Sequence, residues 1–276
     1  MAGGGTGRGY HQYRNLSIWV LLVLLVWLMA PAAGGITREE TLSPQTQTDT
    51  SEEPALPENE PEKDPAEETV SQPEELPAAE PIEAEPVGDD YFADAVFIGD
   101  SRTEGFHLYS GLQQGEYLYA VGATVESVFS KPTQECPGGK QTIMEALGEM
   151  DYAKAYIMLG VNELGWSGTE IFRNQYAKLI QQVREDCPDA QIVLESILPV
   201  SAKQEEKHSY VNNQRIAEYN QVIQSLSEEE QCTYLDLTTL VSDQQGCLRE
   251  DLTEDGVHLN VAGCRLWLEF LKEHPV

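Results

Sequence analysis

The chain has 276 residues and a formal net charge of −30. The charge is uneven: residues 1–35 contain two basic residues and no acid, residues 36–90 contain 18 acidic residues against two basic ones, and residues 91–276 carry the remaining −16. Because nucleic-acid binding depends on a surface rich in Lys and Arg, no nucleic-acid partner is expected.

Residues 16–33 form an apolar run without a charged side chain, and Arg8 and Arg14 precede it. Its length approaches the roughly 20 apolar residues that a membrane-spanning helix needs. The arginines favour a cytoplasmic N-terminus, with the rest of the chain outside the membrane. Residues 1–35 are therefore predicted to be either a single-pass anchor in the cell membrane or a signal peptide. A signal peptide would be cleaved near the small residues Ala30 to Ala33, and the chain would then be secreted.

Residues 36–90 hold nine of the 15 prolines and few large apolar side chains. Such a composition cannot bury enough surface to offset the loss of chain entropy. We predict a disordered, acidic Pro/Glu-rich linker, which would span roughly 40 Å as a flexible coil. Two roles stay open, a passive spacer that lifts the following domain off the membrane and a tract that binds a specific partner.

From residue 91 onward, short apolar runs alternate with longer segments of helical periodicity. Strands that alternate with helices pair in parallel through crossover connections, so residues 91–276 are predicted to form one three-layer α/β domain with about five parallel strands. The strands are predicted at 95–98, 117–121, 155–159, 192–197 and 234–237, and the helices at 142–150, 169–186, 210–226 and 261–272.

Polar residues follow the first three predicted strands. Gly99-Asp100-Ser101 comes after the first strand, Gly122 after the second, and residues 160–163 after the third. Parallel sheets carry their functional loops at the carboxyl ends of the strands. The sequence therefore predicts a functional site at this edge of the sheet.

A serine and a histidine in this part of the chain are suited to nucleophilic catalysis. A serine hydroxyl becomes a nucleophile beside a base that is itself oriented by an acid. His258 lies in a polar turn before the last predicted helix, with Asp255 three residues ahead of it. A turn of this length can place the Asp255 carboxylate on imidazole Nδ1 and leave Nε2 free to face Ser101.

Taken together and in order, these residues resemble the SGNH/GDSL hydrolase family. The four blocks are residues 96–102 with the Gly-Asp-Ser turn, Gly122, residues 160–163, and residues 255–258. The resemblance covers essentially all of residues 91–276 and implies the flavodoxin-like α/β/α fold. It also implies Ser101 as nucleophile, His258 as general base and Asp255 as the residue that orients the base. The oxyanion hole implied by the family consists of the Ser101 and Gly122 N–H groups and the Asn162 side-chain amide.

The chain departs from the family pattern at two positions. Arg102 stands where the family name has Leu, at a position expected to point outward, and Glu163 follows Asn162 where the family usually has Asp. Simpler roles for single residues also stay open. Ser101 could cap the helix after the first strand, and Asn162 could bond its own backbone in a loop. His258 could be an ordinary turn histidine.

The expected function is an extracytoplasmic serine esterase that needs no cofactor or metal and cleaves an acyl or O-acetyl ester on a carbohydrate or cell-envelope substrate. Two alternatives remain, a short-chain lipid or thioester acylhydrolase and a non-catalytic glycan-binding module on the same scaffold. The five cysteines contain no CxxC pair and so no zinc signature. Their odd number leaves at least one thiol free, and disulfide pairing among the others is undecided.

Overall fold

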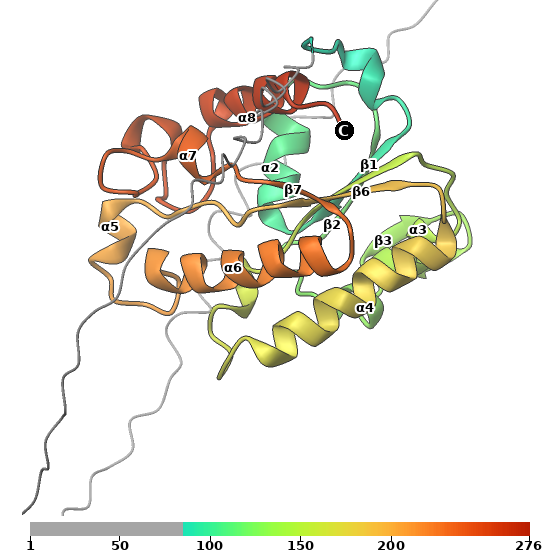
Figure 1. Ribbon diagram of the computed structural model, residues 1–276, viewed down its shortest axis with the longest axis horizontal. Coiled ribbons are helices and arrows are strands. Elements are labelled where there is room, and N and C mark those ends of the chain that lie inside the picture. The colour runs from blue at the N-terminus through green and yellow to red at the C-terminus, as the bar shows by residue number, and fades with distance from the viewer. Residues whose placement is uncertain (1–84) are drawn as a thin grey trace, which may run out of the picture. The chain divides into compact units, whose positions relative to one another are not determined.

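The computed structural model describes residues 85–276 (Figure 1). The predicted anchor or signal peptide, and all but the last residues of the predicted linker, lie outside this range. Within the described part of the chain, no helix is long and apolar enough to cross a membrane.

A five-stranded sheet forms the centre of the described region, and all its neighbouring strands pair in parallel. The order β2-β1-β5-β6-β7 becomes 2-1-3-4-5 when only these strands are counted, which is the flavodoxin-like order. The predicted α/β architecture with five parallel strands is confirmed. The strands are β1 (Ala95–Gly99), β2 (Glu116–Tyr119), β5 (Lys154–Met158), β6 (Gln191–Glu195) and β7 (Thr233–Leu235).

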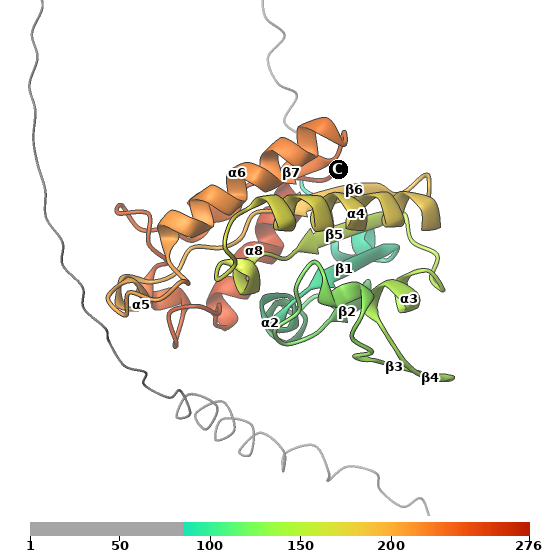
Figure 2. The ribbon, with the colours of Figure 1, turned by 90° about the horizontal axis from the view of Figure 1, so that it is seen from below.

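Helices cover both faces of this sheet, as Figures 1 and 2 show. Side chains of a strand point alternately to its two faces, so β1 contributes Val96 and Ile98 to one apolar cluster and Ala95 and Phe97 to the other. On the first face lie α3 (Ile143–Leu147), α4 (Glu170–Asp186) and α6 (Asn213–Glu229). On the second lie α2 (Ser101–Tyr109), α7 (Thr238–Val241) and α8 (Val261–Glu273).

Short elements complete the described region. Sequence patterns did not predict the two-stranded hairpin, α5 or α7, and they gave no bounds for α2, the helix after the first strand, because short or largely polar segments give no clear apolar periodicity. The elements are α5 (Ala202–Glu205), the hairpin of β3 (Gln134–Cys136) and β4 (Gly139–Gln141), and the 3-10 helices η2 (Asp89–Phe92), η3 (Ser127–Phe129), η4 (Val161–Glu163) and η5 (Glu250–Leu252).

The strand order places a topological switch at β1. The chain steps from β1 to β2 on one side and later to β5 on the other, so the loops at the carboxyl ends of β1 and β5 diverge there. In open α/β sheets, ligands bind at this point. The Gly99-Asp100-Ser101 turn follows β1, and η4 follows β5, so both predicted blocks lie at the switch.

Candidate active site

The turn between β1 and α2 holds Ser101 at the first position of the helix. Gly99 is required there, because a Cβ atom would lie 2.0 Å from the Thr103 hydroxyl and 2.6 Å from the Met158 carbonyl oxygen. Asp100 caps the helix by accepting a hydrogen bond from the Arg102 N–H at 2.8 Å. The cap is thus Asp100 and not Ser101, so the simpler role considered for Ser101 is wrong.

The loop before α8 carries His258 and is held by its own threonine. Thr253 Oγ1 donates to the His258 carbonyl at 2.7 Å and accepts from the Gly256 N–H at 3.0 Å. Gly256 has φ +85°, a conformation that favours glycine, and a Cβ atom there would lie 2.4 Å from Ser201 Oγ. The Ser201 N–H in turn donates to the Gly256 carbonyl at 2.9 Å. The loop is therefore fixed both internally and against the segment after β6.

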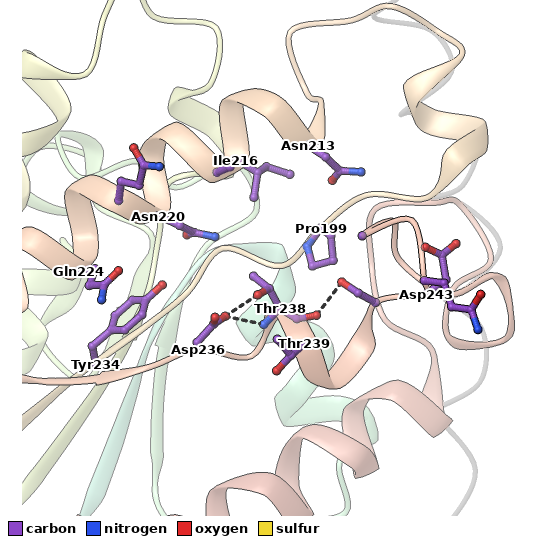
Figure 3. Close-up of a pocket in the computed structure, with 15 residues that line it drawn as sticks. Pro199, Asn213, Ile216, Asn220, Gln224, Tyr234, Asp236, Thr238, Thr239 and Asp243 are labelled. Atoms are coloured by element: carbon purple, nitrogen blue, oxygen red, sulfur yellow. Dashed lines mark hydrogen bonds between the residues drawn. The ribbon is translucent and has the colours of Figure 1, made fainter.

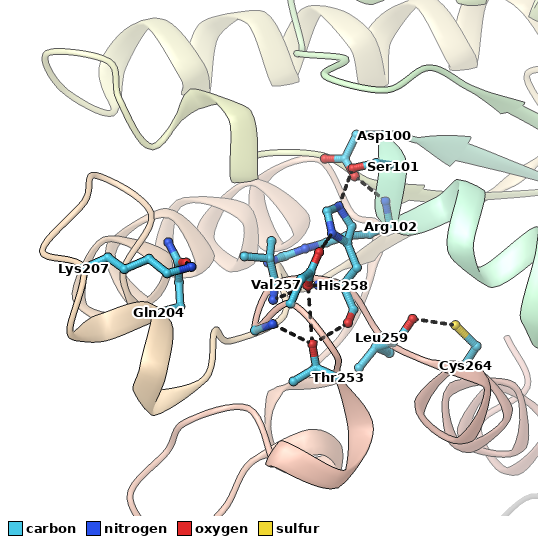
Figure 4. A network of polar contacts seen from close by, with 12 residues as sticks. Asp100, Ser101, Arg102, Gln204, Lys207, Thr253, Val257, His258, Leu259 and Cys264 are labelled. Carbon is cyan, nitrogen blue, oxygen red and sulfur yellow. Dashed lines mark hydrogen bonds and ion pairs between the residues drawn. The ribbon is translucent and has the colours of Figure 1, made fainter. Parts of the chain in front are cut away.

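The structure brings Ser101, His258 and Asp255 together, although Ser101 and His258, both labelled in Figure 4, are 157 residues apart. Ser101 Oγ lies 2.8 Å from His258 Nε2, and His258 Nδ1 lies 2.7 Å from Asp255 Oδ2. With an ionised Asp255, Nδ1 carries the proton and donates it, and Nε2 is left to accept from the serine hydroxyl. This is the hydrogen-bond order that a serine nucleophile requires.

The Asp255 carboxylate is occupied at both oxygens. Oδ1 accepts from the Val257 and His258 N–H groups, each at 2.8 Å, while Oδ2 accepts from the imidazole. Partial burial raises the pKa of Asp255, but these hydrogen bonds outweigh burial and hold the pKa well below its usual range. Asp255 is therefore ionised at neutral pH, as the assigned hydrogen-bond order needs.

The groups expected in the oxyanion hole are the Ser101 and Gly122 N–H groups and the Asn162 amide, and Asn162 contacts Asp100, the neighbour of Ser101. Among the described residues, neither the Ser101 nor the Gly122 N–H donates a hydrogen bond to another backbone or side-chain group. Gly122 has φ +74° and open space around it. Asn162 Nδ2 donates to Ala123 O at 2.9 Å and to Asp100 Oδ2 at 3.2 Å, so its amide protons already have acceptors. Asn162 does not bond its own backbone, and its simpler role is wrong.

Glu163 ties the loop after β5 to the loop that carries Gly122. Its side chain is fully buried, and Oε1 accepts from the Val125 N–H at 2.7 Å. Burial raises the pKa of Glu163 to about 8. Together with the Asn162 contact to Ala123, this bond fixes the Gly122 loop at two points. The side chain of Glu, longer than the family's Asp, thus makes the buried hydrogen bond to Val125.

Arg102 does not point outward as expected from the sequence. Only 3% of the residue is exposed, and its Nη1 donates to the Leu198 carbonyl at 3.0 Å, while Nε and Nη2 have no partner in the described region. Burial lowers the pKa of Arg102 to about 10, partly offset by the nearby carboxylates of Asp100 and Asp255. The outward placement is wrong because α2 turns this side chain under the site, toward the segment after β6.

Other sequence expectations can be placed as well. All five cysteines are free, so the structure contains no disulfide among them. Within residues 85–276, no group of three or more His, Cys, Asp or Glu side chains is arranged to hold a metal ion. The role of Thr253 in holding this loop was not predicted from the sequence, where its only signal was its place in the same polar turn.

Comparison with known proteins gives one family and a set of similar folds. Residues 97–266 match the model of the GDSL-like Lipase/Acylhydrolase family. A Streptococcus pneumonia protein provisionally described as a platelet activating factor is 24% identical with a TM-score of 0.55, over 69% of this chain and 84% of that one. No curated protein matches.

Two further solved structures resemble the described region at lower identity. A protein from Desulfitobacterium hafniense, provisionally described as a lipolytic protein of the G-D-S-L family, is 19% identical with a TM-score of 0.51, over 65% of this chain and 98% of that one. An acetylxylan esterase from Geobacillus stearothermophilus is 17% identical with a TM-score of 0.48, over 65% and 92%. At 19% identity, the resemblance to the Desulfitobacterium hafniense protein concerns the fold alone.

Proposed function

Because the chain belongs to the GDSL-like Lipase/Acylhydrolase family and is an ester hydrolase, we propose that it cleaves an acyl or O-acetyl ester on a carbohydrate through Ser101, His258 and Asp255. The observation that carries this assignment is the continuous hydrogen-bond chain from Ser101 Oγ through both imidazole nitrogens to Asp255 Oδ2. A binding module without catalysis has no need of such a chain.

The proposed reaction uses only groups of this protein. His258 Nε2 takes the proton of Ser101 Oγ as the oxygen attacks the ester carbonyl, and Asp255 stabilises the imidazolium that forms. His258 then gives the proton to the leaving alcohol. Water, deprotonated by His258, attacks the acyl-enzyme and releases the carboxylic acid and Ser101.

The negative charge on the carbonyl oxygen would be held by three donors. The Ser101 N–H is at the N-terminus of α2, where helix N–H groups lack intrahelical partners and the helix dipole favours an anion. The Gly122 N–H is the second donor. Asn162 Nδ2 is the third, once it exchanges its longer bond, to Asp100 Oδ2, for the oxyanion. Catalytic hydrogen bonds often reach their final geometry only in the reacting complex.

Exposure of the triad supports a substrate whose ester is presented on a larger molecule. The side chains of Asp255 and His258 are 56% and 44% exposed, so an ester on a polymer can reach them from solvent. The charge of −16 on residues 91–276 disfavours anionic substrates through repulsion. A neutral glycan that carries a small acyl group satisfies both conditions. The apolar run at residues 16–33 supports action outside the membrane, either anchored or secreted.

One set of assays tests this proposal. The full chain, purified in a mild detergent, should release p-nitrophenol from p-nitrophenyl acetate and acetate from acetylated polysaccharide, and it should turn over p-nitrophenyl octanoate far more slowly. Ser101→Ala should lose all three activities, with Ser110→Ala, a buried serine at the other end of α2, as the matched control. Preference for the octanoate ester would instead favour a lipid acylhydrolase. Turnover unchanged in Ser101→Ala would refute the triad.

A further inference from the structure

A groove of about 690 Å³ lies between α6 and the segment that follows β7, and none of the triad residues lines it (Figure 3). Its floor includes Pro199, in the segment after β6, and Asp236, directly after β7. Both residues stand at the carboxyl edge of the sheet, where parallel α/β sheets bind ligands. The volume is within the roughly 300–1,000 Å³ typical of ligand sites.

The charge of the groove lining disfavours anionic ligands. It contains no Lys, Arg or His, and its charged members are Asp236 and Asp243. The other polar members are carboxamides and hydroxyls, which donate and accept hydrogen bonds without a net charge. Tyr234 and Ile216 add an aromatic ring and an aliphatic side chain. A neutral ligand with many hydroxyl groups and apolar C–H faces matches this lining.

Some side chains that line the groove already have hydrogen-bond partners within the protein. Asn213 and Asn220 are fully engaged, because each donates to and accepts from the backbone of the segment after β6, at Val200 and Ile197. Their role is to hold that segment.

Other side chains in the groove are available to a ligand. Gln221 and Gln224, one helical turn apart on α6, make no side-chain hydrogen bond within the described region. Asp236 uses Oδ1 for the N–H and hydroxyl of Thr238, while Oδ2 accepts from no described residue. The groove thus offers unpaired amides and a carboxylate oxygen along one wall and its floor.

The segment after β6 connects this groove to the catalytic loop. Leu198 O accepts from Arg102, Pro199 lines the groove, and the Ser201 N–H donates to Gly256, next to Asp255. The segment 198–201 has four residues and spans at most about 14 Å. Residues 198–201 are buried, so this segment holds the groove and the catalytic loop in fixed positions relative to each other.

We propose that the groove between α6 and β7 binds a neutral oligosaccharide chain of the polymer that carries the ester. The proposal rests on the proposed function for the identity of the substrate, but binding in the groove needs no catalysis. An added peptide strand fits less well, because β7 offers an edge of only three residues, Thr233–Leu235.

The test is isothermal titration of the full chain, in a mild detergent, with unesterified xylohexaose and separately with the β-1,4-linked hexamer of N-acetylglucosamine. The two sugars distinguish a plant polysaccharide from a cell-wall backbone. We expect one of them to bind and the double variant Gln221→Ala/Gln224→Ala to weaken that binding at least tenfold. Gln214→Ala, on the same helix but outside the groove, should leave it unchanged. All variants should hydrolyse p-nitrophenyl acetate at the wild-type rate, because this small ester does not reach the groove.

Binding of neither sugar to the wild type, or equal affinity in the double variant, would overturn the proposal. These outcomes are separate from a failure of the proposed function. If the wild type does not hydrolyse p-nitrophenyl acetate, the esterase assignment is contradicted. The titration would still decide whether the groove binds a glycan.

Discussion

At the scale of single residues, Asp255 shows how a side chain orients its neighbour. Its Oδ1 is held by two backbone N–H groups of the turn, so Oδ2 can face only the imidazole. The order of hydrogen bonds then sets which nitrogen of His258 carries the proton. The role that we propose for Asp255 is therefore to select the tautomer of His258 as much as to provide charge.

Replacement of Asp255 by Asn tests this role. Asn can still accept the turn N–H bonds through Oδ1, but its NH₂ group then faces Nδ1 and forces the proton onto Nε2. Nε2 would no longer accept from Ser101, so we expect kcat to fall by on the order of 10⁴ with the fold retained. Steady-state kinetics with p-nitrophenyl acetate and circular dichroism measure the two effects. A loss smaller than tenfold would refute the tautomer argument.

The burial of Arg102 and its hydrogen-bond partner could not be predicted from the sequence. The sequence indicated the identity and the order of Ser101, Asp255 and His258, because short motifs at strand ends carry that information. The partner of Arg102 is a carbonyl 96 residues away, at Leu198, and no local pattern encodes such a contact. Its burial under the site could therefore be found only in the folded chain.

At the scale of elements, the proposed active site depends on two loops that are joined by hydrogen bonds. Asn162 bonds Ala123, and Glu163 bonds Val125, so the loop after β5 holds the loop that carries Gly122. Each bond is made by a side chain of η4 to backbone of the neighbouring loop. The position of the Gly122 N–H therefore depends on both loops.

Glu163→Ala should loosen this pair. The variant leaves the buried Val125 N–H without its acceptor, which we expect to cost about 1–3 kcal/mol of unfolding free energy. Because the Gly122 donor would be less well placed, kcat should fall at least tenfold with a smaller change in KM. Glu163→Gln keeps an acceptor at the same position and should retain most activity. Equal losses in kcat for Ala and Gln would contradict a purely positional role.

The prediction of elements succeeded where apolar patterns are long. The five strands and the helices α4, α6 and α8 lie within a few residues of their expected ranges, because each buries a continuous run or a helical stripe. The β3–β4 hairpin has only three residues per strand, and α5 and α7 have four each. Such elements are stabilised by tertiary contacts rather than by local pattern.

At the scale of the whole molecule, two buried carboxyl groups link stability to pH. Burial raises the pKa of Glu163 and of Glu195 to about 8 each, and the Trp267 Nε1–H donates to Glu195 at 2.8 Å. Both values lie above the ordinary value of 4.5. Between pH 4.5 and 8 the folded chain therefore binds more protons at these two sites than the unfolded chain, and their contribution to stability falls as pH rises.

The expected slope is on the order of 1 kcal/mol per pH unit for each group. Asp255, with a lowered pKa, titrates below this window. Urea unfolding at pH 5, 6.5 and 8 should show the decline in the wild type and a smaller decline in Glu195→Gln, which keeps an acceptor for Trp267 but cannot ionise. An identical slope in the variant would show that Glu195 does not titrate in this range.

The central claim is that Ser101 is a nucleophile activated by His258, and covalent labelling tests it most directly. The full chain treated with a fluorophosphonate should gain one phosphonyl group, and peptide mass spectrometry should place it on Ser101. His258→Ala should react far more slowly, and Ser101→Ala should gain no label. An active chain that is labelled at another residue, or that stays unlabelled while it hydrolyses p-nitrophenyl acetate, would contradict the account.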